Sequence, residues 1–118
     1  MRSLFLASAL IAAVALPAAA QSVAGKYSVA GTNFDGSTYT GEAEITQLSQ
    51  TTCAIRWNTG GSVSKGVCMR NEDAFAAFYA LGKTFGLVVY KVMPDGSLHG
   101  VWTITGQNGS GTEVLTPK

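Results

Sequence analysis

Two loops of the chain share the sequence Asp-Gly-Ser, and each lies between two stretches in which apolar and polar residues alternate. The first loop covers residues 33–37 and the second covers residues 93–97. Asp-Gly at the centre of such a loop is typical of a type I turn that ends on a left-handed glycine and joins two antiparallel strands. The chain is therefore expected to fold largely as antiparallel β-hairpins.

The strand pairing that these turns imply sets a glycine opposite an aromatic residue in both hairpins. Gly31 faces Tyr39 in the first hairpin, and Gly100 faces Tyr90 in the second. An aromatic ring can lie over a glycine because glycine has no side chain, and strongly curved sheets and small barrels fill their interiors in this way. Both hairpins thus indicate a curved sheet.

The first twenty residues form a segment separate from the hairpins. An apolar run follows Arg2 and leads to Pro17-Ala18-Ala19-Ala20. This pattern is typical of a secretory signal peptide, and the apolar run is too short for a permanent membrane anchor. We expect residues 1–20 to be a cleavable signal peptide and residues 21–118 to be one domain, exported to the periplasm or the medium.

The charge of the exported domain is balanced. Eight basic residues less Arg2 of the leader leave seven, against seven acidic residues, when His99 is neutral. Proteins that bind nucleic acids or anionic membranes carry clusters of Lys and Arg, and the basic residues of this chain are isolated from one another. A nucleic-acid partner and, after signal cleavage, a membrane partner are both disfavoured.

The two cysteines are brought together by a further predicted hairpin. Gly60-Gly61 is a two-residue hairpin signal, and the register around it aligns Trp57 with Ser64 and Cys53 with Cys68. Directly paired antiparallel residues have Cα atoms about 4.5 to 5.5 Å apart, which a disulfide accepts, and an exported chain meets an oxidising compartment. The sequence therefore predicts a Cys53–Cys68 disulfide. Two cysteines and one histidine cannot by themselves build a closed zinc site, so no metal or other cofactor is expected.

The alternation of apolar and polar residues extends over most of the domain and predicts about eight short strands joined by tight turns. The expected strands lie near residues 26–31, 39–46, 52–58, 62–69, 72–82, 85–92, 98–104 and 111–115. Short sequential strands favour an all-β fold, a single small antiparallel up-and-down β-barrel, over a Greek-key sandwich. Residues 72–82 also fit a capped helix that stops at Gly82, although closure of the sheet favours a strand.

Aromatic residues on the inward faces of these strands form a candidate ligand pocket at one mouth of the barrel. The pocket is predicted from Tyr27, Tyr39, Trp57, Tyr90 and Trp102, with Tyr79 as a further inward aromatic residue. An eight-stranded barrel is just wide enough either to be filled by its own side chains or to hold one small ligand. The sequence does not distinguish a barrel interior filled by side chains from a hollow one.

The chain offers no arrangement of residues that predicts catalysis. His99 is expected on the outer face beside Lys91, without a nucleophile or carboxylate placed to act with it. Glu42 and Glu44 share an outer strand face and do not converge as paired acids would. An enzyme is therefore disfavoured.

Several stretches resemble a family of small exported proteobacterial proteins that are often labelled fibronectin-binding. They cover nearly the whole exported part, in the same order, and include residues 25–33, 35–37, 52–57, 66–69, 86–90, 95–102 and 111–117. The resemblance implies export, a small β-barrel fold and adhesion to a matrix protein of a host.

Two functions of different classes follow. The first is a non-catalytic adhesion module that presents the loops near Phe34, Met93 and Asn108 to an extracellular matrix protein or another surface protein; an exposed apolar patch around these loops would favour it. The second is a carrier resembling lipocalins or avidin, which holds a small apolar or aromatic ligand. An internal cavity near Trp57 and Trp102 would favour the carrier.

Overall fold

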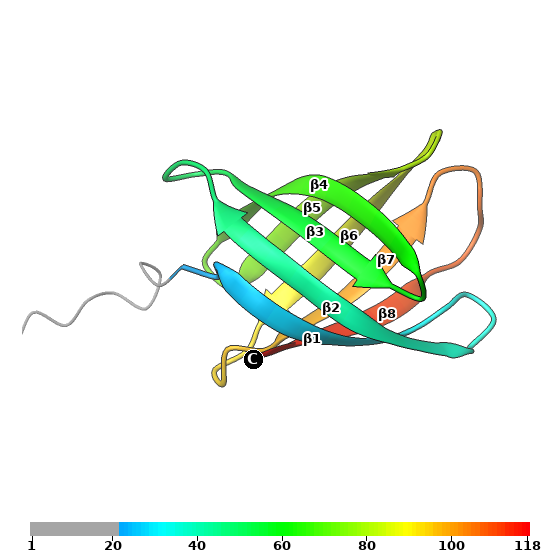
Figure 1. Cartoon of the computed structure of the whole chain (residues 1–118), viewed down its shortest axis with the longest axis horizontal. Coiled ribbons are helices and arrows are strands. Elements are labelled where there is room, and N and C mark those ends of the chain that lie inside the picture. Colours follow the sequence, from blue (N-terminus) through cyan, green and yellow to red (C-terminus); the bar gives the residue numbers. More distant parts are fainter. Residues whose placement is uncertain (1–21) are drawn as a thin grey trace, which may run out of the picture.

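A computed structural model of the chain describes residues 22–118; the predicted signal peptide lies outside the described residues. The strands are β1 (Gly25–Thr32), β2 (Thr38–Gln47), β3 (Cys53–Thr59), β4 (Ser62–Asn71), β5 (Ala74–Leu81), β6 (Thr84–Val92), β7 (Leu98–Ile104) and β8 (Gly111–Pro117). Each strand pairs antiparallel with the next, and β8 pairs with β1, so the sheet closes on itself (Figure 1). The predicted up-and-down barrel is confirmed. No helix within residues 22–118 is long and apolar enough to cross a membrane.

The strand registers expected from the turns are also confirmed. Gly31 pairs with Tyr39 in β1 and β2, and Tyr90 pairs with Gly100 in β6 and β7. The Gly60-Gly61 turn has φ angles of 57° and 82°, which a two-residue hairpin of this kind requires and glycine adopts without strain. Local turn chemistry and a two-residue period thus set the pairing of neighbouring strands.

The segment that also fitted a helix is strand β5. It pairs with β4 on one side and with β6 on the other, so sheet hydrogen bonds are available to its backbone on both sides. Phe75, Ala77 and Tyr79 are buried on one face, while the alternate residues between them are exposed. Gly82, with φ of 61°, belongs to the β5–β6 turn and does not end a helix. Pairing with two neighbours therefore decides the conformation here.

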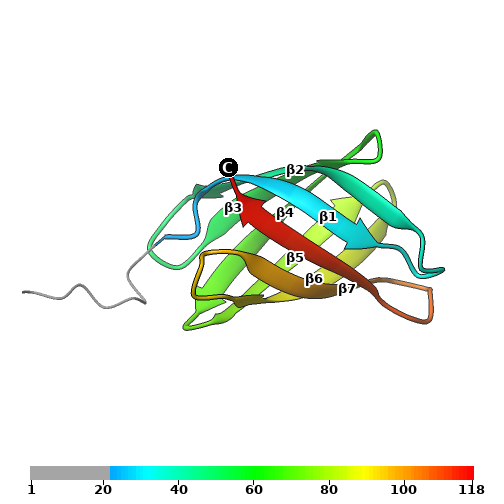
Figure 2. The same ribbon diagram turned by 90° about the horizontal axis from the view of Figure 1, so that it is seen from below.

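The strands alternate in direction, so their turns gather at two ends of the barrel. The open end carries the turns at residues 33–37, 60–61, 82–83 and 105–110. The closed end carries the turns at residues 48–52, 72–73 and 93–97, together with the segment 22–24 before β1. The turns after β1 and β7 project from the open end in both ribbon views (Figures 1 and 2).

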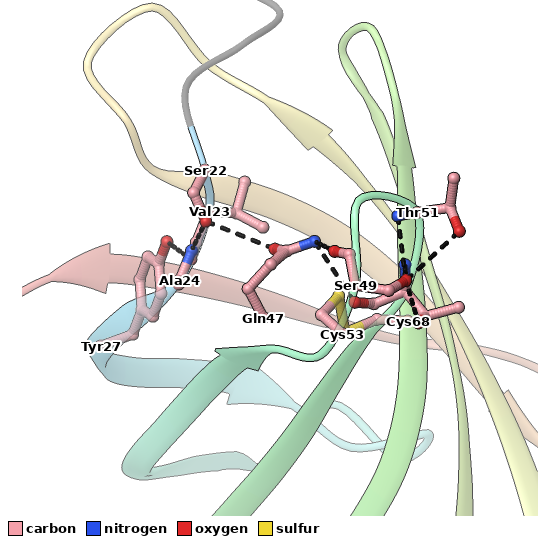
Figure 3. Close-up of a disulfide and its surroundings, with 10 residues drawn as sticks. Ser22, Val23, Ala24, Tyr27, Gln47, Ser49, Thr51, Cys53 and Cys68 are labelled. Carbon is pink, nitrogen blue, oxygen red and sulfur yellow. Dashed lines mark hydrogen bonds between the residues drawn. A yellow bond between two sulfur atoms is a disulfide. The ribbon is translucent and has the colours of Figure 1, made fainter.

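The closed end is filled by side chains. Phe75, Leu98 and Leu115 have no exposed surface there. Val23 is 7% exposed, and its carbonyl oxygen accepts a hydrogen bond of 2.5 Å from the Tyr27 hydroxyl, so the segment before β1 covers this end (Figure 3).

The predicted disulfide between Cys53 and Cys68 is confirmed and lies at the same end, joining β3 to β4 with Cα atoms 4.9 Å apart (Figure 3). Gln47 lies close by, and its side-chain amide donates to the Ser49 carbonyl at 2.6 Å, which ties the β2–β3 turn to the end of β2. Covalent and hydrogen-bonded links thus reinforce the closed end.

Candidate functional site

A cavity of about 360 Å³ opens at the other end of the barrel. It is lined by Asn33, Tyr39, Trp57, Thr59, Gly60, Ser62, Ser64, Tyr79, Leu81, Val88, Trp102, Ile104 and Glu113. This volume lies within the range of small-molecule pockets, which combine apolar and aromatic walls with a few polar groups. The interior is therefore filled at the closed end and hollow at the open end.

Glycines opposite aromatic residues set the positions of the rings around the cavity. A Cβ atom added to any of four glycines would overlap the ring that lies across from it in the neighbouring strand. The pairs are Gly31 with Tyr39, Gly86 with Tyr79, Gly100 with Tyr90, and Gly111 with Trp102. Glycine at these positions leaves the space that the rings occupy, and three of the four rings, those of Tyr39, Tyr79 and Trp102, line the cavity.

Aromatic contacts continue from the wall to the mouth of the cavity. Phe34, in the β1–β2 turn, stacks on Trp102 with ring centroids 4.9 Å apart and an interplanar angle of 26°. Tyr39 meets Trp102 edge to face at 6.4 Å, and Trp57 meets Tyr79 in the same manner at 5.3 Å. Edge-to-face and offset-stacked pairs are the preferred geometries of aromatic rings, so these contacts hold the wall in a defined shape.

A carboxylate lies among these rings. Glu113 of β8 is 6% exposed, and one of its oxygens, Oε1, accepts a hydrogen bond of 2.7 Å from the Tyr39 hydroxyl. Its other oxygen, Oε2, accepts from the indole Nε1 of Trp57 at 2.9 Å and from the Tyr90 hydroxyl. Four strands therefore converge on one buried acidic group, since β2, β3 and β6 each supply a donor to β8.

All three donors to Glu113 are neutral groups. Within residues 22–118, no ion pair of Glu113 is present, whereas Lys118 and Glu42 form an ion pair of 2.8 Å on the outer surface. In the same part of the chain, no lysine, arginine or histidine lines the cavity. The carboxylate is thus hydrogen-bonded, but its charge is not balanced by a basic side chain among the described residues of the cavity wall.

The tyrosines around Glu113 respond to burial and to its charge. Burial first, and then the negative charge of Glu113, raises the pKa of Tyr90 well above its ordinary value. The same two causes raise the pKa of Tyr39, and they raise the pKa of Tyr79 to about 12. These hydroxyls therefore keep their protons at neutral pH and remain hydrogen-bond donors.

The structure separates the aromatic residues that the sequence grouped into one pocket. Tyr39, Trp57 and Trp102 line the cavity. Tyr90 is 1% exposed and is not part of the lining; its hydroxyl binds Glu113. Tyr27 differs from the prediction, because it lies near the start of β1, at the closed end, and its hydroxyl binds the Val23 carbonyl. Inward direction alone does not say at which end of the barrel a side chain lies.

The three predicted protein-binding loops do not share one surface. Phe34 and Asn108 are in turns at the open end, whereas Met93 is in the turn at the closed end. Phe34 is half-buried against Trp102, so part of its ring is already engaged within the molecule. Antiparallel topology places the β1–β2 and β6–β7 turns at opposite ends of the barrel. The similar sequences of the two turns do not indicate at which end each turn lies.

Glu113 was missed by sequence reasoning, although the two-residue period of β8 contains a signal for it. Gly111, Glu113 and Leu115 alternate with threonines and a valine, so Glu113 shares a face with Leu115, which is fully buried. The signal is weak because the segment is short and because Val114, on the opposite face, is also apolar. Which of the two faces points into the barrel becomes clear only when β8 pairs with β1 and β7.

Several designed β-barrels of known structure share this fold. The redesigned β-barrel b11L5F_LGL has a TM-score of 0.70 at 19% identity, over 81% of this chain and 91% of that chain. The redesigned β-barrel mFAP1, solved bound to DFHBI, has a TM-score of 0.68 at 18% identity, over 80% and 94% of the two chains. A fluorescence-activating β-barrel designed de novo has a TM-score of 0.68 at 16% identity, over 87% of this chain and 100% of that chain.

These similarities show the fold alone. No protein-family model matches the chain, and no curated protein matches it.

Proposed function

We propose that the protein is an exported, non-catalytic carrier that holds a small apolar or aromatic molecule in the cavity at the open end of the barrel. The observation that carries this proposal is the combination of a hollow open end, walled by Tyr39, Trp57, Tyr79 and Trp102, with a closed end packed by side chains. Export rests on the signal peptide expected in residues 1–20.

The polar groups of the cavity suit a carrier. Their positions are set by hydrogen bonds within the barrel, since Tyr39 and Trp57 are both bound to Glu113. Preset polar groups in an otherwise apolar and aromatic wall orient a ligand without a large ordering cost. Barrels of this fold have room for a ligand, because mFAP1 was solved bound to DFHBI, and this precedent supports the carrier by analogy of fold.

The adhesion module has less support. Its loops lie at opposite ends of the barrel. The large exposed apolar side chains lie mainly on the outer face of β4 to β7 and not around Phe34, Met93 and Asn108. Binding of a matrix protein through these three loops together would require a partner that contacts both ends at once.

Tryptophan fluorescence tests the carrier directly, because both tryptophans of the chain line the cavity. The mature protein is titrated with small aromatic compounds, and native mass spectrometry is applied to protein purified from its own host without denaturation. We expect a saturable change in fluorescence and a retained small molecule in the mass spectrum.

A matched pair of variants locates the binding. Ser64→Leu places a larger side chain in the cavity wall and should weaken binding about tenfold or more, whereas Ser28→Leu, on the exposed outer face of β1, should leave it unchanged. Equal binding by both variants, or a bare mass together with no fluorescence response to any compound, would overturn the carrier.

A further inference from the structure

We propose that the ligand of this cavity is an organic cation, with an ammonium group held between the aromatic wall and the Glu113 carboxylate. This inference rests on the proposed carrier function and specifies the class of its ligand.

The charge of the buried Glu113 carboxylate is not balanced by a basic side chain of the described cavity lining. Burial of a carboxylate is costly unless hydrogen bonds and an opposite charge compensate for the water it loses. Three neutral donors supply the hydrogen bonds, and no basic side chain from residues 22–118 lines the cavity. A ligand with a positive charge would supply the compensation that the cavity wall lacks at this position.

The wall of the cavity is rich in aromatic rings. Tyr39, Trp57, Tyr79 and Trp102 surround the cavity, and Phe34 stacks on Trp102 at the mouth. The faces of aromatic rings carry partial negative charge and attract cations, most strongly where water is excluded, and clusters of aromatic residues recognise quaternary ammonium groups in this way. The rings and the carboxylate therefore favour the same sign of charge.

The remaining groups of the lining agree with this preference. The neutral polar side chains of the lining, apart from the aromatic residues, are Asn33, Thr59, Ser62 and Ser64, which all offer oxygen acceptors. An anionic ligand would meet Glu113 without a basic residue of the described lining to offset the repulsion. The cavity is thus suited to a cation, tolerates a neutral ligand and disfavours an anion.

The test compares two probes of nearly equal shape that differ in charge, phenyltrimethylammonium and its neutral isostere tert-butylbenzene. Each is titrated into the mature protein, and into the variant Glu113→Gln, with tryptophan fluorescence as the readout. Glutamine keeps the size of the side chain, and its amide group can donate to the Tyr39 hydroxyl, so the fold should be retained; a melting curve checks this.

We expect the native protein to bind phenyltrimethylammonium about tenfold or more tightly than tert-butylbenzene, and Glu113→Gln to lose most of this difference while its affinity for tert-butylbenzene changes little. The cationic ligand would be overturned if the native protein bound both probes equally, or if Glu113→Gln kept the preference for phenyltrimethylammonium. Either result would still agree with the proposed carrier function. Binding of neither probe by the native protein would overturn the cation and count against the carrier.

The outer surface of the barrel carries a set of exposed apolar side chains on one side. Eight large apolar side chains on β4 to β7 point outward and are 42% to 60% exposed: Val63, Val67, Met69, Phe78, Phe85, Leu87, Val89 and Val101. The strand registers place them side by side, since Val67, Phe78 and Leu87 are consecutive cross-strand neighbours. We refer to this set as the apolar outer face. The outward positions of β1 to β3 are instead mainly threonine, serine and charged residues.

We infer that the apolar outer face is the interface of a two-fold dimer of this chain. Eight side chains about half exposed present roughly 700 Å² of surface, which is close to the 800 Å² that each partner contributes to a standard stable interface. A patch of this size exceeds what a monomeric protein ordinarily leaves in water. An isologous dimer covers two such faces at once.

The charges at the two ends of this face favour one orientation of the dimer. Lys83 lies in the β5–β6 turn at the open end, and exposed Lys65 of β4 lies toward the same end. Glu72 and Asp73 form the β4–β5 turn at the closed end, where Lys91 of β6 is also exposed and the Nε of Arg70 donates to the Glu72 carbonyl. A two-fold axis perpendicular to the barrel axes sets the open end of one copy beside the closed end of the other, so Lys83 approaches the acidic turn. Both cavities then remain open to solvent.

Sedimentation equilibrium of the mature protein in the micromolar range tests the dimer. We expect a dimer for the native chain and a monomer for Leu87→Glu, whereas Thr40→Glu on the polar side of the barrel should remain dimeric. Lys83→Glu should weaken the dimer, and combining it with Glu72→Lys and Asp73→Lys should restore it. A monomeric native chain, including one that instead sediments with phosphatidylcholine vesicles, would overturn the dimer.

Discussion

Each end of the barrel carries one Asp-Gly-Ser turn, although one end is filled by side chains and the other is hollow. At the open end, the backbone N–H of Asn33 donates to the Ser37 carbonyl at 2.7 Å, and the Asp35 carboxylate accepts the Ser37 N–H at 2.9 Å. At the closed end, the corresponding distances for Met93, Ser97 and Asp95 are 2.8 and 2.9 Å. The local geometry of the two turns is therefore the same.

The surroundings of the two turns differ. Ser97 is buried and precedes Leu98, which has no exposed surface, whereas Ser37 is exposed. Phe34 of the open-end turn stacks on Trp102 above a cavity. The two ends thus differ in the side chains that the strands direct inward. Near the closed end these are mainly aliphatic residues and Phe75, whereas near the open end they are aromatic rings that lie opposite glycines.

The largest expected effect is a contrast between the same substitution at the two ends. Phe75→Ala removes a ring with no exposed surface from the closed end and should lower the free energy of unfolding by about 3 to 5 kcal/mol. Phe34→Ala removes a half-buried ring stacked on Trp102 and should cost about 1 kcal/mol or less. Urea denaturation measures both.

Phe34→Ala should in turn weaken ligand binding, because its ring stacks on Trp102, which lines the cavity. If Phe75→Ala does not fold, Phe75→Leu, which leaves a smaller void, provides the measurable variant. Equal losses of stability at the two ends would contradict the division into a filled end and a hollow end.

Removal of the disulfide should destabilise the protein without affecting the cavity. Cys53 and Cys68 are 15 residues apart, and the chain-entropy model assigns a cross-link of this length about 3 kcal/mol. Replacing both cysteines with serine should lower the melting temperature sharply, and a reductant should have no further effect on this variant. Affinity for an aromatic probe should stay unchanged in the folded protein, and free thiols in the oxidised native chain would contradict the pairing.

Alkaline pH should act through the tyrosines near Glu113. Burial and the Glu113 charge raise the pKa of Tyr79 from 10.0 to about 12, and they also raise the pKa values of Tyr39 and Tyr90. The folded state therefore holds these protons more tightly than the unfolded state, so stability is fully present below pH 10 and falls as the pH rises from there through the folded-state values.

Denaturation curves recorded between neutral pH and pH 11 measure this loss. Glu113→Gln removes one of the two causes and should lower the folded-state pKa of Tyr79, so the decline should level off at a lower pH than in the native protein, whereas the disulfide variant should follow the native curve. A decline that Glu113→Gln leaves unchanged would mean that burial alone holds these protons.

The smallest effect should separate the two Asp-Gly-Ser turns themselves. Asp35→Ala and Asp95→Ala each remove hydrogen bonds to the N–H and hydroxyl of the serine two residues on. Asp95→Ala should lower the melting temperature more than Asp35→Ala, because the Ser97 hydroxyl is buried and cannot regain its partner from water. A larger loss of melting temperature in Asp35→Ala than in Asp95→Ala would show that burial of Ser97 does not strengthen the closed-end turn.

Most of the fold was predictable because it rests on local rules. Alternation places Phe75, Ala77 and Tyr79 on one face of β5, and Gly60-Gly61 aligns Cys53 with Cys68, without reference to the rest of the barrel. The candidate site was predictable only in part. Of the aromatic residues predicted to form one pocket, Tyr39, Trp57 and Trp102 line the cavity together, whereas Tyr27 lies near the start of β1 at the closed end.

The sequence by itself determined the strands, their registers, the curvature indicated by glycines opposite rings and the disulfide, because turns and a two-residue period act between residues close along the chain. Only the tertiary structure decided where the cavity lies and that Glu113 belongs to it. The bond from Tyr39 to Glu113 joins residues 74 positions apart, and it exists because β8 closes the barrel against β1. Closure brings inward side chains from distant strands to one level of the barrel, and no local pattern specifies that level.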